Sequence, residues 1–298
     1  MFCLKEIYSS IYKKFKERNF SSPQIETELI LTKSLNLTKE QIYTYPQILL
    51  SKKQIDCINR NLLYRLNHKP IAYIFKNKEF FGLNFYVDEN VLIPRQETEF
   101  LVEEAIKLIK TKKLYSVADI GTGSGNIIIS VIKNLDVDFE KYKFYATDIS
   151  EKVLDIAKKN ARYHNVETKI KFLLTDKLKY FVDNRLKLDI ILSNPPYVSE
   201  KEYKDLQKEI YYEPKLALVS STGLEFYEHF AFYGKKVLAY NGYFVFEINS
   251  NLLNEIIFLF EKNKYKVIKV VNDYQNLPRV IVIKNNYGKI YNRRWDKT

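Results

Sequence analysis

The sequence is poor in the residues that build disulfides and metal sites. It has only two cysteines, Cys3 and Cys57, and three histidines among 298 residues. Two thiols cannot form a disulfide framework, and no Cys/His cluster has the spacing of a metal-ligand set. The composition therefore predicts a reducing compartment and no bound metal ion.

Long apolar runs are also missing. No stretch approaches the roughly 18 consecutive apolar residues of a membrane-spanning helix. The amino-terminal stretch "MFCLKEIYSSIYKKFKERNF" has an early acidic residue and no continuous apolar core, so it predicts an amphipathic helix and not a signal peptide. We therefore expect no membrane association and a cytoplasmic location.

The excess of positive charge has two explanations. The net charge is +12, which is typical of proteins with anionic partners such as nucleic acids. However, only 9 of the 48 basic residues are arginine, and the lysines are spread along the whole chain. This distribution indicates compositional drift of a genome, because no segment concentrates the charge. We expect that nucleic acid is not the substrate.

The first part of the chain has a helical pattern. Three segments before residue 75 repeat apolar residues at three- and four-residue steps, which predicts a small helical bundle over residues 1–75. Residues 76–96 then alternate aromatic and polar side chains around Gly82, as expected of a β-hairpin that links two domains.

Strand-like and helical segments alternate from residue 97 onward, which predicts an α/β domain with a mostly parallel sheet over residues 97–298. The last two strand-like runs, 265–273 and 278–286, are separated by a short loop. One of these two strands is therefore expected to run antiparallel, since a parallel pair needs a longer crossover.

A glycine-rich turn, "DIGTGSGN", follows the first strand of this domain and precedes the helix "NIIISVIKN". Glycines let a ligand approach the backbone, and the helix amino terminus points amide groups at it. The turn is not a P-loop, because no Lys-Ser/Thr follows, and it lacks the last glycine of the dinucleotide fingerprint. A tight turn without a ligand would use the same glycines. The predicted binding residues are Gly121, Thr122, Gly123, Ser124 and Gly125.

Two aspartates follow the next two strands. Asp148 ends the second strand, where its carboxylate could accept hydrogen bonds from both hydroxyls of a ribose. It could instead cap the following helix, a role that is also open to Ser150. Asp176 comes after the third strand and could reach an adenine amino group or cap a short helix. Together with the glycine turn, these residues predict a nucleoside-containing cofactor.

The motif Asn-Pro-Pro-Tyr follows the fourth strand, and its prolines fix the loop. The Asn194 side-chain oxygen and the Pro195 carbonyl would be two acceptors for one planar NH2 group, with the Tyr197 ring stacked on it. Such hydrogen bonds favour a pyramidal nitrogen, so they stabilise the transition state of attack more than the ground state. An ordinary loop is the alternative. If the cofactor is S-adenosylmethionine, its methyl group would be attacked in line by such an amide or arylamine nitrogen. The predicted catalytic residues are Asn194, Pro195 and Tyr197, and together with Pro196 they form the predicted substrate site. Asn194 is also expected to contact the cofactor.

Several segments together resemble the PrmC/HemK family, the protein-(glutamine-N5) methyltransferases that modify peptide chain release factors. The segments that match this family are "DIGTGSG", "ATDIS", "SNPPYV", "EPKLAL" followed by "GLEFY", and residues 69–99. With the helical part included, the resemblance covers nearly the whole chain. It implies that the glycine turn and Asp148 hold S-adenosylmethionine, and that Asn194 to Tyr197 hold the glutamine of a Gly-Gly-Gln motif.

Other functions remain open at this point. Asn-Pro-Pro-Tyr is shared with methyltransferases that act on DNA adenine-N6 or RNA guanine-N2, which would grip a flipped base in the same way. A non-catalytic binding module would keep the fold but lose these loop residues. Residues 1–75 carry no cofactor motif, so we expect them to recognise the release factor, because one glutamine side chain offers little surface for specificity. They could instead merely cap the sheet.

Three features depart from the family pattern or carry no assigned chemistry. Lys177 belongs to the predicted cofactor site but stands where the family often has an aromatic residue, which removes the expected partner for adenine stacking. Asn249 stands where the family tends to have glycine. Arg95, Thr98 and Glu99 match the family segment, but they could simply initiate a helix, and we assign them no chemistry.

Overall fold

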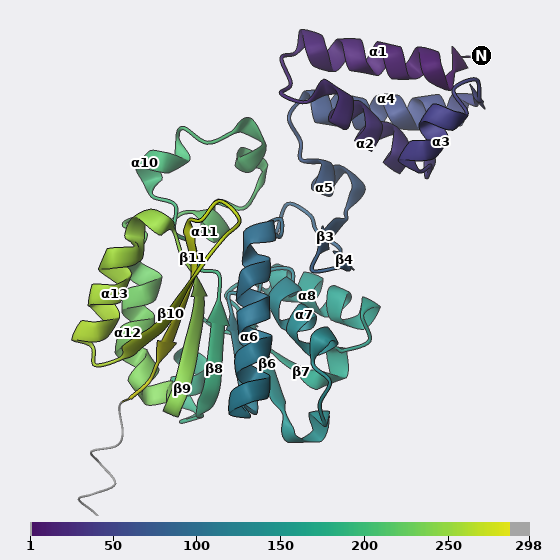
Figure 1. The fold of residues 1–298 in the computed structure, drawn as a ribbon. Coiled ribbons are helices and arrows are strands. Elements are labelled where there is room, and N and C mark those ends of the chain that lie inside the picture. Colours follow the sequence, from purple (N-terminus) through teal and green to yellow (C-terminus); the bar gives the residue numbers. More distant parts are fainter. Residues whose placement is uncertain (1, 287–298) are drawn as a thin grey trace, which may run out of the picture. The chain divides into compact units, whose positions relative to one another are not determined.

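The computed structural model describes residues 2–286 and divides the chain into two compact units (Figure 1). The first unit contains residues 2–76 together with 207–212, and the second contains residues 77–206 and 213–286. The predicted boundaries included residues 207–212 in the methyltransferase domain, whereas in the structure this segment lies with the helices of the first unit.

The first unit is a helical bundle, as the apolar spacing predicts. Pro23 begins the second helix, and capping boxes start the third and fourth helices at Thr38 and Ser51. The apolar faces enclose a core around Leu4, Phe15 and other fully buried side chains. The elements are β1 (Phe2–Cys3), α1 (Leu4–Glu17), α2 (Pro23–Leu35), α3 (Lys39–Thr44), β2 (Leu49–Leu50), α4 (Lys52–Leu66), α5 (Ile71–Phe75) and the 3-10 helix η4 (Lys208–Tyr212).

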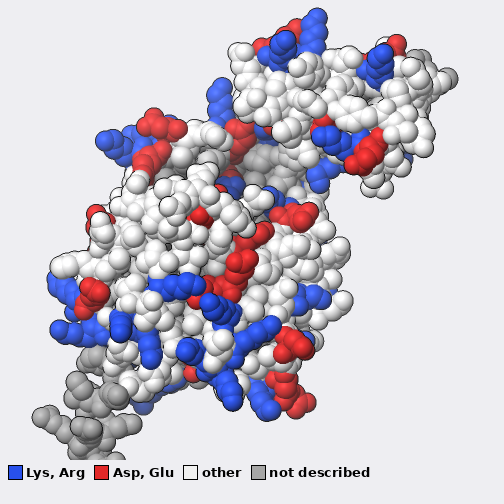
Figure 2. Space-filling model, in the orientation of Figure 1, with Lys and Arg blue, Asp and Glu red and all other residues white. Residues whose placement is uncertain are grey.

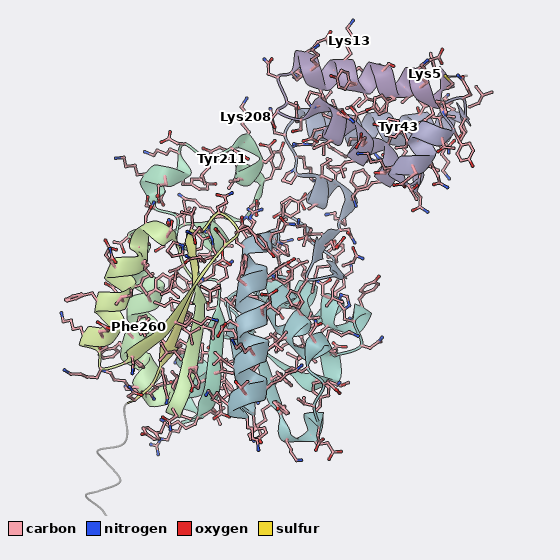
Figure 3. All side chains as sticks on the ribbon, in the orientation of Figure 1. Lys5, Lys13, Tyr43, Lys208, Tyr211 and Phe260 are labelled. Carbon is pink, nitrogen blue, oxygen red and sulfur yellow. The ribbon has the colours of Figure 1, made fainter. Side chains whose placement is uncertain are left out.

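A buried arginine attaches the segment 207–212 to this bundle. Arg65 donates to both carboxylate oxygens of Glu26, at 2.7 and 2.6 Å, and to Oε1 of Glu209 at 3.0 Å. The Tyr212 hydroxyl donates to the carbonyl oxygen of Asn67 at 2.7 Å. Figure 3 labels Lys208 and Tyr211 on the same segment.

The second unit is built on a seven-stranded sheet with the order β10-β11-β9-β8-β5-β6-β7. The neighbours from β9 to β7 are parallel, and β11 is antiparallel to both β9 and β10. This arrangement confirms the predicted mostly parallel sheet with an antiparallel strand. The strands are β5 (Ser116–Ile120), β6 (Lys143–Asp148), β7 (Ile170–Leu174), β8 (Leu188–Ser193), β9 (Leu238–Glu247), β10 (Lys266–Asn272) and β11 (Pro278–Lys284).

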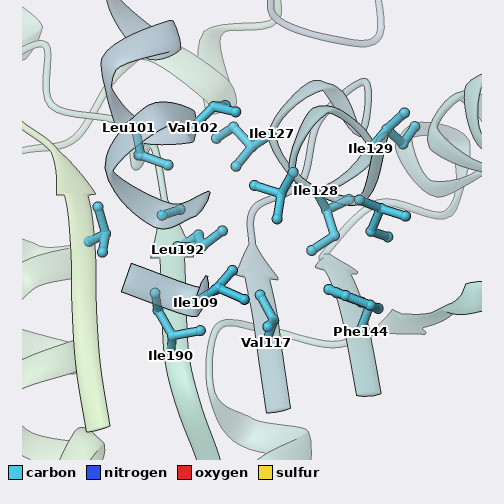
Figure 4. Packing of buried hydrophobic residues seen from close by; sticks show 14 of the residues in the cluster. Leu101, Val102, Ile109, Val117, Ile127, Ile128, Ile129, Phe144, Ile190 and Leu192 are labelled. Carbon is cyan, nitrogen blue, oxygen red and sulfur yellow. The ribbon is translucent and has the colours of Figure 1, made fainter. Parts of the chain in front are cut away.

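Helices cover both faces of the sheet, and successive residues of β8 point to opposite faces. Ile190 and Leu192 pack with α6 and α7 on one face (Figure 4), and Ile191 packs with α12 and α13 on the other. On that second face Phe260 of α13, labelled in Figure 3, is fully buried beside Phe244. The helices are α6 (Glu99–Lys112), α7 (Asn126–Asn134), α8 (Glu151–Tyr163), α9 (Lys179–Asp183), α10 (Glu200–Tyr203), α11 (Lys215–Leu218), α12 (Glu225–Val237) and α13 (Leu253–Lys262).

The remaining elements of this unit are short. Strands β3 (Lys78–Phe80) and β4 (Leu83–Phe85) form a two-stranded hairpin in the predicted linker region. The short 3-10 helices are η1 (Gln96–Thr98), η2 (Phe139–Lys141), η3 (Glu167–Lys169) and η5 (Ser250–Leu252).

The order of the strands fixes where a ligand can bind. The chain runs from β5 through β6 to β7 on one side, and then returns to place β8 on the other side of β5. A crevice forms at such a switch point, outside the carboxyl ends of the strands. The glycine turn follows β5 and the Asn-Pro-Pro-Tyr loop follows β8, so both lie at this point.

On the face seen in Figure 2, the described residues show no one-sided concentration of charge at that edge. Figure 2 shows Lys and Arg interspersed with Asp and Glu on each unit, and basic side chains of the second unit gather toward its lower end, away from α10 and α11. None of the helices within residues 2–286 combines the length and hydropathy needed to cross a bilayer.

Candidate active site

A cavity of about 440 Å³ lies at the switch point of the sheet. Its volume falls within the roughly 300–1,000 Å³ that is usual for small-molecule sites. Most of the predicted site residues come together in its wall, whereas Gly125 and Tyr197 do not line it. The predicted residues that line it are Gly121, Thr122, Gly123, Ser124, Asp148, Asp176, Lys177, Asn194, Pro195 and Pro196.

The glycine turn needs glycine for its backbone conformation. Gly121, Gly123 and Gly125 all have positive φ, at 73°, 55° and 80°. A Cβ on Gly125 would lie 2.9 Å from Cδ1 of Ile129, so this glycine permits close packing of α7. A Cβ on Gly121 or Gly123 would meet no atom within 4 Å, which means that these two positions border open space.

Asn160 of α8 holds the turn in place from behind. Its Nδ2 donates to the carbonyl oxygens of Ser124, at 2.8 Å, and Tyr86, at 3.0 Å, and its Oδ1 accepts from the Tyr86 amide at 2.7 Å. Asn160 is 1% exposed, so these bonds are shielded from water. The end of the β3–β4 hairpin is therefore bonded through one side chain to the loop that lines the cavity.

Asp148 both faces the cavity and closes the turn after β6. Its Oδ1 accepts from the Ser150 amide at 3.1 Å, and its Oδ2 accepts from the Gly123 amide at 3.3 Å. Burial raises the pKa of Asp148, and the backbone hydrogen bonds oppose this shift. The bond to Ser150 lies before α8, whose N-cap is Ser150 and has no side-chain cap hydrogen bond, so Asp148 does not cap this helix. Each carboxylate oxygen keeps a second lone pair for a ligand.

An aromatic residue from another segment lies beside Lys177. Lys177 pairs with Oδ1 of Asp176 at 2.9 Å, and its Nζ lies 4.8 Å from the ring centroid of Phe226. Phe226, in the segment "GLEFY" at the start of α12, lines the cavity together with Ile149 and Val153. An apolar wall for a flat base is thus present without an aromatic residue at position 177.

The Asn-Pro-Pro-Tyr loop presents only part of its motif to the cavity. Pro195 is buried, and the loop is tied down where the Val198 amide donates to the Leu218 carbonyl at 3.0 Å. The Tyr197 hydroxyl instead donates to Oε1 of Glu247 at 3.1 Å, and burial raises the pKa of this tyrosine. Stacking of the Tyr197 ring on a substrate amide stays a prediction.

Sequence reasoning gave no role to several residues that border this loop. Thr98 lines the cavity, donates to Oε2 of Glu247 at 2.6 Å and accepts from Nδ2 of Asn194 at 3.3 Å. Arg95 also lines it and donates to Oε1 of Glu213 at 2.5 Å. Arg95 and Glu213 lie in segments that carry the family resemblance, which is the signal that could have found them. Glu247 ends an apolar strand two residues before Asn249, in the stretch where the family tends to have Glu-Ile-Gly.

The cavity fits the predicted cofactor. Open space beside two glycines lets a ligand approach the backbone, Asp148 offers acceptors for ribose hydroxyls, and apolar side chains offer a surface for adenine. Within residues 2–286 no group of three or more His, Cys, Asp or Glu residues is placed to hold a metal ion.

Comparison with known proteins identifies the family. The model of the PrmC N-terminal domain matches residues 6–75, and that of N-6 DNA methylase matches residues 91–268. A release factor glutamine methyltransferase of Chlorobaculum tepidum is 33% identical over 282 residues, or 92% of this chain and 94% of the relative. The one from Flavobacterium psychrophilum is 38% identical, over 86% of this chain and 85% of the relative. The chain belongs to the release factor glutamine methyltransferase family.

A solved structure agrees with the fold. The hMettl16 catalytic domain, crystallised in complex with MAT2A 3'UTR hairpin 6, has a TM-score of 0.53 and 18% identity. The match covers 70% of this chain and 77% of that one, and it concerns the fold alone. The resemblance stated from the sequence is confirmed, as are the methyltransferase class and S-adenosylmethionine as the methyl donor.

Proposed function

We propose that this protein transfers a methyl group to the side-chain amide nitrogen of the glutamine in the Gly-Gly-Gln motif of peptide chain release factors. The names of the relatives support this substrate. The observation that carries the chemistry is the position of Asn194 and Pro195 in the wall of the cavity that contains the glycine turn. Because release factors work in translation, the proposal includes a cytoplasmic location.

The residues divide into two groups by task. Bound S-adenosylmethionine supplies an electrophilic methyl group on its sulfonium. Asp148 and the amides of the glycine turn bind and orient this cofactor. The Asn194 Oδ1 and the Pro195 carbonyl oxygen accept hydrogen bonds from the two N–H groups of the glutamine amide. These bonds favour the pyramidal nitrogen that attacks the methyl group. No general base is needed before the attack, because the methylated nitrogen loses its proton readily afterwards.

Methylation of DNA adenine or RNA guanine is the less favoured function. The N-6 DNA methylase model covers residues 91–268 and leaves residues 2–76 of the first unit unmatched, whereas the relatives named for release factors match over both units. The charge distribution also offers no basic surface concentrated at the carboxyl edge of the sheet in the view of Figure 2.

One experiment compares the candidate substrates directly. The full-length protein is incubated with labelled S-adenosylmethionine and, in parallel, with a release factor, duplex DNA and ribosomal RNA. We expect label only in the release factor, and peptide mass spectrometry should locate it on the glutamine of Gly-Gly-Gln. Transfer to either nucleic acid with none to the release factor would contradict the proposal.

We also propose that the first unit recognises the protein substrate. It exposes apolar side chains, including Leu63 and Tyr64 on α4, at 60% and 45% exposure. A specific protein contact usually buries about 1,200 to 2,000 Å² in total, which one glutamine cannot supply. Leu63→Asp should raise KM for the intact release factor and leave kcat/KM for a short Gly-Gly-Gln peptide unchanged. An equal effect on both substrates would favour the capping role.

A further inference from the structure

A chain of hydrogen bonds holds the Asn194 side chain from a buried carboxylate. Glu247, the last residue of β9, is 1% exposed, and its Oε2 accepts from the Thr98 hydroxyl at 2.6 Å. The same hydroxyl oxygen accepts from Nδ2 of Asn194 at 3.3 Å. Three segments that are distant in the sequence therefore meet behind the substrate loop.

The direction of this chain follows from counting protons. A hydroxyl has one proton, and Thr98 gives it to Glu247 in a bond whose length is typical of O–H donation to a carboxylate. With Glu247 ionised, Thr98 can only accept from Asn194, so the NH2 group of Asn194 points toward it. A reversed amide would set two acceptors against each other or turn the Thr98 proton away from a buried carboxylate, and either change leaves a buried polar group without its partner.

The same carboxylate holds the far end of the loop. Glu247 Oε1 accepts from the Tyr197 hydroxyl at 3.1 Å, and the Glu247 carbonyl oxygen accepts from the Tyr227 hydroxyl at 2.8 Å. Because Ser193 pairs with Phe246 across β8 and β9, the Glu247 side chain lies next to the start of the loop. One side chain is thus bonded, directly or through Thr98, to the first and last residues of Asn-Pro-Pro-Tyr.

We propose that Thr98 and Glu247 are positioning residues that orient the Asn194 amide with Oδ1 toward the substrate, so that the site selects a side-chain amide over a carboxylate. The inference rests on the proposed function for its substrate. The NH2 group of glutamine can donate to Oδ1 of Asn194. A glutamate carboxylate, which differs by this one group, has only acceptors to offer and meets another oxygen.

The first test measures selectivity in the full-length protein. The substrate is a Gly-Gly-Gln peptide of a release factor, and the inhibitor is the same peptide with glutamate in place of glutamine. Thr98→Val removes the hydroxyl, so we expect kcat to fall about tenfold, the effect of one hydrogen bond, and the glutamate peptide to bind about tenfold more tightly. Thr98→Ser keeps the hydroxyl and should restore most of the parent's kcat and selectivity.

The second test needs no substrate. The side-chain NH2 signals of Asn194 are assigned in an NMR spectrum of the amide groups by their loss in Asn194→Ala. Removal of the acceptor in Thr98→Val should shift both signals, and Thr98→Ser should leave them near the parent positions. If Thr98→Val does not fold, Thr98→Ala is used, because the space it leaves admits a water that can donate to Glu247.

A matched control separates this effect from the loss of any buried hydroxyl. Thr27 of α2 is also fully buried, and its hydroxyl donates to the Pro23 carbonyl oxygen at 2.8 Å, but it does not line the cavity. Thr27→Val should leave the preference for glutamine over glutamate unchanged.

Unshifted Asn194 signals, or unchanged selectivity in Thr98→Val, would overturn the proposal. Absence of methyl transfer by the parent protein would instead refute the proposed function, and the NMR signals would still decide the orientation of Asn194.

Discussion

The proposed cofactor half of the cavity, formed by the glycine turn and Asp148, takes its geometry largely from backbone groups of the turns after β5 and β6, with Asn160 as a side-chain support. Its glycines adopt positive φ, and its carboxylate is held by amides of Gly123 and Ser150. The substrate half instead depends on side chains from three segments, since Asn194 is held by Thr98 and Glu247. Local geometry can be read from a motif, whereas a site assembled from distant side chains cannot.

The largest effect should come from the substrate half. Asn194→Ala removes one of two acceptors that strengthen as the amide nitrogen becomes pyramidal, so kcat should fall by about 10²-fold, as for loss of one preorganised transition-state hydrogen bond. Calorimetry should show nearly unchanged cofactor affinity, because the glycine turn and Asp148 remain. Turnover at the parent rate would refute this role for Asn194.

A change at Asp148, in the cofactor half, should weaken the binding of S-adenosylmethionine and leave the rate of methyl transfer unchanged. Asp148→Ala removes acceptors for the ribose, and binding of S-adenosylmethionine should weaken by about 1.5 to 3 kcal/mol, the range for hydrogen bonds to a charged group. Circular dichroism checks that the variant is folded, and calorimetry measures Kd. With saturating cofactor, kcat should stay near the parent value. An unchanged Kd in a folded variant would remove Asp148 from the site.

The comparison also explains which residues the sequence could and could not predict. Gly121 to Gly125 and Asp148 were predictable because they follow or end strands that the apolar pattern indicates. Glycine is also the residue typical of backbone with positive φ. Thr98 looks like an ordinary helix start, and its acceptor Glu247 lies 149 positions away. Phe226, which lines the cavity beside Lys177, lies 49 positions from it in the sequence.

Contacts between distant parts of the sequence also explain why the placement of residues 207–212 and the direction of Tyr197 could not be predicted. The helices of the first unit follow from three- and four-residue spacing, and the parallel sheet follows from alternating strands and helices. The attachment of residues 207–212 to the first unit depends on Arg65, whose contact with Glu209 joins positions 144 apart. The direction of the Tyr197 hydroxyl likewise depends on Glu247, which lies 50 positions away in the sequence.

A pH experiment tests whether ionisation of the buried Asp119, next to the glycine turn, lowers the free energy of unfolding. Burial raises the pKa of Asp119 on β5 to about 7, well above the roughly 3.9 of an exposed aspartate. Between these values the folded state binds a proton that the unfolded state does not, so the free energy of unfolding falls as pH rises. The slope is at most about 1.4 kcal/mol per pH unit. Asp119→Asn should lack this slope and be more stable than the parent at pH 8. Urea unfolding without cofactor at pH 4 to 8 measures both, and parallel curves would contradict the prediction.

The smallest effect should come from the segment that follows the substrate loop into the first unit. Glu209→Gln keeps an acceptor for Arg65 but removes the charge of a partly exposed pair, so stability should change by less than about 1 kcal/mol. If residues 207–212 help the first unit to bind the release factor, KM for the intact factor should rise by up to about fivefold, the equivalent of that energy. The cofactor Kd should not change. Lys208→Gln, an exposed charge on the same segment, is the matched control. A rise in KM that is equal in both variants would point to lost surface charge and not to the contact of Glu209 with Arg65.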